Sequence, residues 1–205
     1  YDASQSGLLE EASDKKTPNL VNIYEQFRTA YSIPHIFSAM VLVYNKEKIA
    51  TPPVSFNEAL DPKYKGRVGF SDILFAANTL FAGLANGGNM SSYDAGTKFL
   101  AKLKANDPKV FPSNEAVAAA FKSGEIWISC MWKARALQWQ NDGLPLGFVV
   151  PKEGAVAVTF EGAVPKSSRN KDGAWKYLNA MMDPKGQVEF AKAMGYAPTV
   201  RNAEL

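Results

Sequence analysis

Short apolar segments alternate along this chain with helical patterns of about ten residues, and this alternation limits the possible folds more than any other feature of the sequence. The apolar segments are rich in Val, Ile, Phe and Tyr, whereas the helical patterns end at Gly, Asn-Gly or Asp-Pro. Such alternation is typical of helices packed on a largely parallel sheet, so we predict an α/β fold. The predicted strands are 31–45, 67–70, 109–111, 125–131, 146–150 and 155–160. The predicted helices are 78–86, 92–105, 114–121, 134–141, 172–182 and 185–194. A further short helix is predicted after a capping box formed by Ser55 and Glu58.

Composition excludes several classes of protein. The 205 residues are 46% hydrophobic and 21% charged, which is enough to form a core. A net charge of +3 without a basic run argues against a nucleic-acid-binding protein. No segment reaches the roughly 18 apolar residues of a membrane helix. Residues 1–16 lack the pattern of a signal peptide, so the sequence by itself fits either a cytosolic protein or one whose signal peptide lies outside it.

The sequence contains few of the residues and motifs that are typical of catalytic, metal or cofactor sites. A single cysteine, Cys130, and a single histidine, His35, leave no cluster for zinc and no disulfide, and we expect no metal and no cofactor. There is no P-loop, no GxGxxG after a strand and no GxSxG elbow. We interpret His35 as a satisfied polar residue near the surface. Cys130, in IWISCMW, is typical of a buried small hydrophobe; the alternative is a nucleophile activated by Lys133 or Glu125.

Three predicted strands end in residues that suit a ligand site, because open α/β sheets bind ligands at their strand ends. Ser71-Asp72 follows the strand 67–70, and we favour a helix-capping role for Asp72 over pairing with a ligand cation. Phe160-Glu161 ends the strand 155–160. Trp132 follows the strand 125–131 and is either a core residue or a ligand wall.

Two cations, Lys133 and Arg135, come directly after Trp132. Main-chain N–H groups at a strand-to-helix junction favour anions, and these side chains would add to that preference. We favour the interpretation in which both are simply solvated.

Four segments, in this order, resemble the extracellular solute-binding proteins of ABC transporters, in the group that includes spermidine/putrescine-binding proteins. They are YSIPHIFSAMVLVYNKEKI, SFNEALDPKYKGRVGFSD, AVAAAFKSGEIWISCMW and the closing portion from Gly147 to Val200, in which PKEG, VPKS and GYAPT stand at the family's usual spacing. The resemblance covers about residues 7–200.

This resemblance implies a type II periplasmic-binding-protein-like fold, with two α/β lobes joined by a hinge and a cleft between them. Residues 1–44 would be a remnant of the first lobe with the first crossing strand, 45–154 the second lobe, and 155–205 the second crossing and the return to the first lobe. Family members begin with roughly a hundred further residues, so we expect the first lobe to be incomplete here. A complete receptor is expected to be a monomer, and a truly truncated one could dimerise through exposed strand edges.

The resemblance also implies a function. The protein would be a periplasmic receptor, not an enzyme, that captures a small solute and delivers it to ABC permease subunits in the membrane. Site residues carried over or inferred from strand ends are Trp132, which matches the family's binding tryptophan, together with Phe37, Ser38, Ser71, Asp72, Phe160, Glu161 and Arg135.

Departures from the family pattern bear on the solute. Polyamine-binding members carry an acid where this chain has Phe160, and Glu161 stands one position later, on the other face of the strand. Lys133 replaces a small polar residue after Trp132 and would repel ammonium groups. We therefore expect a zwitterion or a small organic anion in preference to a polyamine. The alternative function is a thiaminase-like transferase on the same fold, with Cys130 as its nucleophile.

Overall fold

The computed structural model describes residues 3–204, and these residues form two compact units. Unit 2 comprises Ala39–Ala157, and unit 1 comprises Tyr1–Ser38 together with Val158–Leu205. The chain passes from one unit to the other within the long strand β1 (Ile33–Asn45) and at the start of β6 (Ala157–Gly162). The boundaries between the units along the chain therefore fall within β1 and β6, a few residues from the lobe boundaries that the sequence suggested; the assignment of lobes itself stays a prediction.

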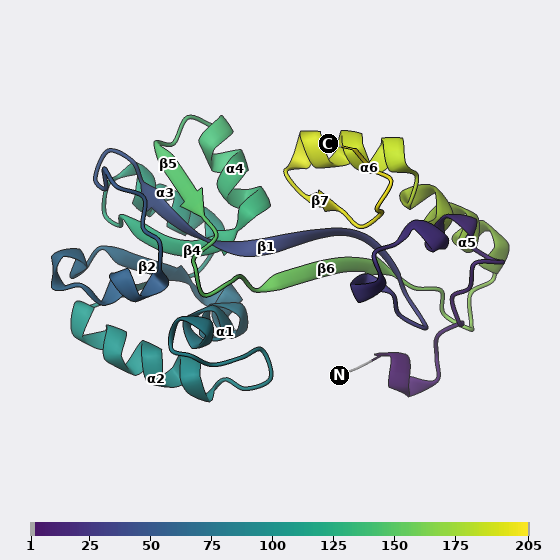
Figure 1. The fold of residues 1–205 in the computed structure, drawn as a ribbon, viewed down its shortest axis with the longest axis horizontal. Helices are drawn as coiled ribbons and strands as arrows, with labels where there is room; N and C mark the ends of the chain where they lie inside the picture. Colours follow the sequence, from purple (N-terminus) through teal and green to yellow (C-terminus); the bar gives the residue numbers. More distant parts are fainter. Residues whose placement is uncertain (1–2, 205) are drawn as a thin grey trace. The chain divides into compact units, whose positions relative to one another are not determined.

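Unit 2 is a sheet with helices on both faces (Figure 1). The strand order is β3-β2-β4-β1-β5. Strands β3 (Lys109–Phe111), β2 (Val68–Ser71) and β4 (Ile128–Trp132) are parallel to one another, whereas β1 is antiparallel to β4 and to β5 (Leu146–Val149).

The second half of β1 explains why this segment is apolar without interruption. Met40, Leu42 and Tyr44 pack into one core cluster with α1 (Phe75–Ala85) and α2 (Asp94–Leu103). Val41 and Val43 pack into the other cluster with α3 (Asn114–Lys122) and α4 (Lys133–Asn141). Because successive side chains of a strand point to opposite faces, a strand buried on both faces must be apolar at nearly every position.

Unit 1 contains the first half of β1, which pairs with the two-residue strand β7 (Ala197–Pro198), and two helices, α5 (Lys171–Met181) and α6 (Pro184–Met194). Its core includes Ile33, Trp175 and Leu178. Buried Gln187 links α6 to β1 and to the segment after β7, because its side-chain amide donates to the carbonyl oxygen of His35 and accepts from the amides of Thr199 and Val200.

Short 3₁₀ turns complete the described chain in both units, at Ala3–Ser6, Pro18–Asn22, Glu25–Phe27, Phe56–Leu60, Pro62–Tyr64, Asp72–Leu74 and Lys104–Asn106.

Local sequence signals placed most of these elements correctly. The strand Lys109–Phe111 has the predicted bounds, and Ser113 caps α3 by accepting a hydrogen bond from the amide of Ala116 at 3.1 Å. The Ser55/Glu58 capping box is present, although it begins a 3₁₀ turn and not an α-helix. The predicted helix at 78–86 starts three residues earlier, at Phe75.

At Gly96, α2 lies close against the backbone of α1. A Cβ atom built at Gly96 would lie 1.8 Å from the carbonyl oxygen of Thr79 in α1, far inside any van der Waals contact. We predict that Gly96→Ala lowers the free energy of unfolding by about 2 kcal/mol or more, measured by urea denaturation, because two helical backbones would have to separate. At an exposed helical position the same exchange would be stabilising by up to about 1 kcal/mol.

The matched control is Ala101→Gly, on the exposed face of the same helix, which should cost only about 1 kcal/mol. A Gly96→Ala variant as stable as the wild type would contradict the close approach of α1 and α2.

Candidate functional site

The parallel strands of unit 2 end at one edge of the sheet, which we call the carboxyl edge. β3 ends at Phe111, β2 at Ser71 and β4 at Trp132. Each strand leads into a helix or turn whose first residues lie at the same edge: α3, the turn Asp72–Leu74 before α1, and α4. Four of the predicted site residues, Ser71, Asp72, Trp132 and Arg135, therefore lie at this edge.

Ser71 is a fully buried polar residue at the end of β2. Its hydroxyl oxygen has no hydrogen-bond partner among the described residues. Its carbonyl oxygen accepts from the side-chain amide of Asn78 at 2.9 Å, and the thiol of Cys130 donates to the oxygen of that same amide group at 3.5 Å. Asn78 thus ties the end of β2 to β4.

The prediction that Asp72 caps the next helix is wrong. Asp72 is the first residue of a 3₁₀ turn, α1 begins only at Phe75, and the position before α1 is Leu74, which makes no side-chain capping bond. The turn intervenes because three residues separate the end of β2 from the start of α1. Asp72 is instead exposed, without an ion pair among the described residues, beside the exposed hydrophobic residues Ile73 and Phe75.

Trp132 stands at the junction between β4 and α4. It is half-buried and packs against the core cluster on the α1/α2 face. The amino end of α4 carries no side-chain cap, so its first N–H groups are not bonded by the residue before the helix. Arg135, in the first turn, is 3.9 Å from the carboxylate of Glu115 and donates to Gln138 at 3.3 Å, while Lys133 is exposed.

The sequence analysis missed Asn114. This residue opens α3 at the carboxyl edge, and its side-chain oxygen is buried without a hydrogen-bond partner among the described residues. The strand 109–111 and the Ser113 cap were both recognised, and together with the parallel order of the sheet they would have placed Asn114 beside Ser71 and Trp132 at the same edge.

The other four predicted site residues belong to unit 1. Phe37 packs on Phe27, with ring centroids 4.8 Å apart, and lines a pocket of about 300 Å³ within that unit. Ser38 is buried, and its hydroxyl oxygen has no hydrogen-bond partner in the described part of the chain.

Phe160 and Glu161 differ in how far they are engaged. Phe160 is 43% exposed and meets the ring of Tyr196 edge to face at 5.4 Å. The carboxylate of Glu161 accepts a hydrogen bond from the hydroxyl of Ser32, so one of its oxygens already has a partner.

His35, which the sequence placed near the surface, is half-buried against Phe190, and this burial lowers the pKa of its imidazole.

The chain matches, over residues 2–205, the family of bacterial extracellular solute-binding proteins. It belongs to this family. The spermidine/putrescine-binding periplasmic protein of Salmonella typhimurium is 24% identical over an alignment of 204 positions, which covers 94% of this chain and 58% of that protein. The chain thus spans less than two thirds of the length of this relative.

Solved structures confirm the predicted α/β, periplasmic-binding-protein-like fold. A spermidine/putrescine ABC transporter substrate-binding protein from Streptococcus pneumoniae matches with a TM-score of 0.84 at 20% identity, over 98% of this chain and 65% of that chain. The solved structure named the Atu4243-GABA receptor matches with a TM-score of 0.83 at 22% identity, over 98% of this chain and 63% of that chain.

The family match confirms the resemblance to extracellular solute-binding proteins that the four sequence segments indicated. The names of the curated relatives are those of periplasmic proteins, which agrees with the periplasmic localisation that we expected. Within residues 3–204, the structure contains no helix that is both long and apolar enough to span a membrane.

Cys130 lacks the setting of a nucleophile. Its side chain is fully buried, and burial raises the pKa of the thiol well above its usual range. Its hydrogen-bond partner is Asn78, not a base. The two charged residues near it in sequence point elsewhere, because Glu125 pairs with Lys109 at 2.8 Å and Lys133 is exposed. The prediction of a buried cysteine is confirmed, and the thiaminase-like alternative is not favoured.

This burial predicts how the thiol reacts. In native buffer at pH 7–8 an aromatic disulfide reagent should leave Cys130 unlabelled over minutes, because the thiol stays protonated and out of reach of the reagent. In urea the same reagent should label one thiol per chain at once. Rapid labelling of the native protein would contradict the buried position.

The raised pKa of the Cys130 thiol also makes the free energy of unfolding depend on pH. The unfolded thiol begins to ionise near pH 8.5, whereas the folded thiol does not. The contribution of Cys130 to stability is therefore complete below that pH and is lost as the pH rises further.

Proposed function

We propose that this chain is part of a periplasmic receptor that captures a small polar solute and delivers it to the permease subunits of an ABC importer. The observation that carries the proposal is the carboxyl edge of unit 2. There, two buried side-chain oxygens without a hydrogen-bond partner in the described part of the chain, on Ser71 and Asn114, lie at the same sheet edge as the half-buried Trp132. A few fixed polar groups beside an aromatic wall suit a small solute.

We further propose that the solute is a zwitterion or a small organic anion. Both signs of charge are present at the carboxyl edge: Asp72 and Glu115 are acidic, and Lys133 and Arg135 are basic. The uncapped amino end of α4 adds a partial positive charge that favours a carboxylate or phosphonate group. A polyamine would need an excess of acids, since each ammonium group requires a compensating partner.

Known relatives support either class of solute. One matching protein is named for spermidine and putrescine, which are polycations, and another for GABA, which is a zwitterion. The same fold therefore serves both, and the residues at the strand ends must decide between them. Phe37, Ser38, Phe160 and Glu161 lie in unit 1 and remain candidate ligand-binding residues on the family resemblance alone.

Calorimetry against amino acids, 4-aminobutyrate, dicarboxylates, putrescine and spermidine tests the proposal. We expect saturable binding of a zwitterion or an anion and weaker or no binding of the polyamines. Trp132→Ala should weaken the tightest binder by about 1–3 kcal/mol, the usual scale for removing an aromatic anchor. The control Tyr177→Ala, an aromatic residue that is 68% exposed on α5, should leave the affinity unchanged.

Three results would count against the proposal. Tightest binding of a polyamine would overturn the preference for a zwitterion or anion. An affinity that is insensitive to Trp132→Ala would remove this residue from the site. The absence of saturable binding for every compound would overturn solute capture by this chain.

A further inference from the structure

A pocket lies at the opposite edge of the unit 2 sheet, which we call the amino edge. Its volume is about 490 Å³, and its lining includes Lys48, Glu58, Lys63, Tyr64 and Trp127. β1 runs antiparallel to β4, so the end of β1 meets the start of β4, where the amide of Asn45 donates to the carbonyl oxygen of Trp127 at 2.9 Å. None of the eight candidate solute-site residues lines this pocket.

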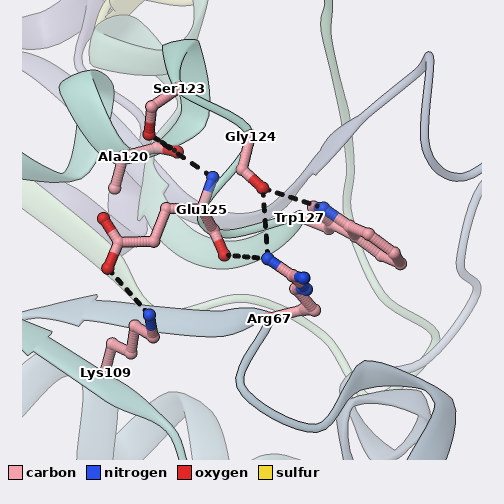
Figure 2. Close-up of polar contacts among 7 residues, drawn as sticks. All are labelled: Arg67, Lys109, Ala120, Ser123, Gly124, Glu125 and Trp127. Carbon is pink, nitrogen blue, oxygen red and sulfur yellow. Dashed lines mark hydrogen bonds and ion pairs between the residues drawn. The ribbon is translucent and has the colours of Figure 1, made fainter.

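One wall of this pocket, the ring of Trp127, is held in a fixed position. Its indole N–H donates to the carbonyl oxygen of Gly124 at 3.1 Å, and the guanidinium of Arg67 stacks over the ring at 5.0 Å from its centroid. Arg67 in turn donates to the carbonyl oxygens of Gly124 and Glu125, at 3.4 and 3.1 Å (Figure 2). The same loop is tied to β3 by the ion pair of Glu125 with Lys109 at 2.8 Å. A preorganised aromatic surface loses little entropy when a ligand covers it.

Tyr64 contributes a second aromatic ring. It is 5% exposed and follows the turn at Asp61, just before β2. The ammonium of Lys63 lies 4.8 Å from the centre of this ring and 3.2 Å from the carboxylate of Asp61. The ion pair and the ring together hold Lys63 at the pocket.

Two cations, Lys48 and Lys63, and one acid, Glu58, lie on the lining of the pocket. Lys48 is exposed, makes no ion pair among the described residues and passes beside Gly124. One carboxylate oxygen of the acid, Glu58, accepts from the amides of Val54 and Ser55, and these bonds hold the group in the capping box without removing its charge. An ammonium group that forms no ion pair, on the lining of an aromatic pocket, favours an anion.

We propose that the amino-edge pocket binds a small organic anion with a flat aromatic or conjugated body. The anionic group pairs with Lys48, and the flat body lies against Trp127 and Tyr64. The volume lies in the range of small-molecule sites. The five residues of β4 separate this pocket from the carboxyl edge by about 15 Å, at roughly 3.3 Å per residue, so the two sites are distinct.

The probe is 2-naphthoate, titrated into the whole chain and followed by calorimetry, with 2-naphthamide as its neutral counterpart. We expect saturable binding of one naphthoate per chain, weakened by added salt and at least about 10-fold tighter than binding of the amide, because a charge-assisted contact is stronger than a contact between neutral groups. Lys48→Gln should remove most of this difference between acid and amide. Lys46→Gln, in the same turn but outside the lining, should change it less than about 2-fold.

A second variant, Trp127→Leu, tests the aromatic wall and should weaken both naphthyl compounds, with circular dichroism used to verify the fold. Trp132→Ala, at the carboxyl edge, should leave naphthoate binding unchanged, which separates this site from the proposed solute site. The proposal is overturned by the absence of saturable binding, by equal affinity for acid and amide, by an unaffected Lys48→Gln variant, or by loss of binding on Trp132→Ala.

Discussion

The rest of this structure depends on β1, one strand of thirteen residues that serves both units. Its second half lies between β4 and β5 in the sheet of unit 2 and is buried on both faces, while its first half pairs with β7 in unit 1. Burial on both faces fixes the register, since a slip by one residue would exchange Met40, Leu42 and Tyr44 for Val41 and Val43. A fixed register then places β4, and with it both ends of the parallel sheet.

The two edges of that sheet carry different chemistry for a simple reason. At the carboxyl edge, the amino end of α4 has no side-chain cap, and the buried side-chain oxygens of Ser71 and Asn114 have no hydrogen-bond partner among the described residues. At the amino edge, the turns that lead into the strands bring cations and aromatic rings together, and the carbonyl oxygens of Gly124 and Glu125 already accept hydrogen bonds from Arg67. The first arrangement suits a small polar solute, and the second suits a flat anion.

Much of the fold and part of the candidate site could be predicted from the sequence. The caps at Ser55 and Ser113 and the strand 109–111 were correct because neighbouring residues determine them. Asp72 was assigned wrongly because a short 3₁₀ turn leaves little pattern in sequence. Asn114 was missed because its importance depends on which strands are neighbours. The amino-edge pocket could not be foreseen, because it joins Lys48, Tyr64 and Trp127 from three separate segments.

Hydrogen exchange of the chain, with and without its tightest solute, tests the central claim that solute binds at the carboxyl edge of unit 2. The account predicts that exchange slows at residues 71–75, 111–115 and 132–136, where β2, β3 and β4 end. Exchange at residues 46–51 and 123–127, at the amino edge, should not change. Protection confined to the amino edge, or none at the three strand ends under saturating solute, would contradict the account.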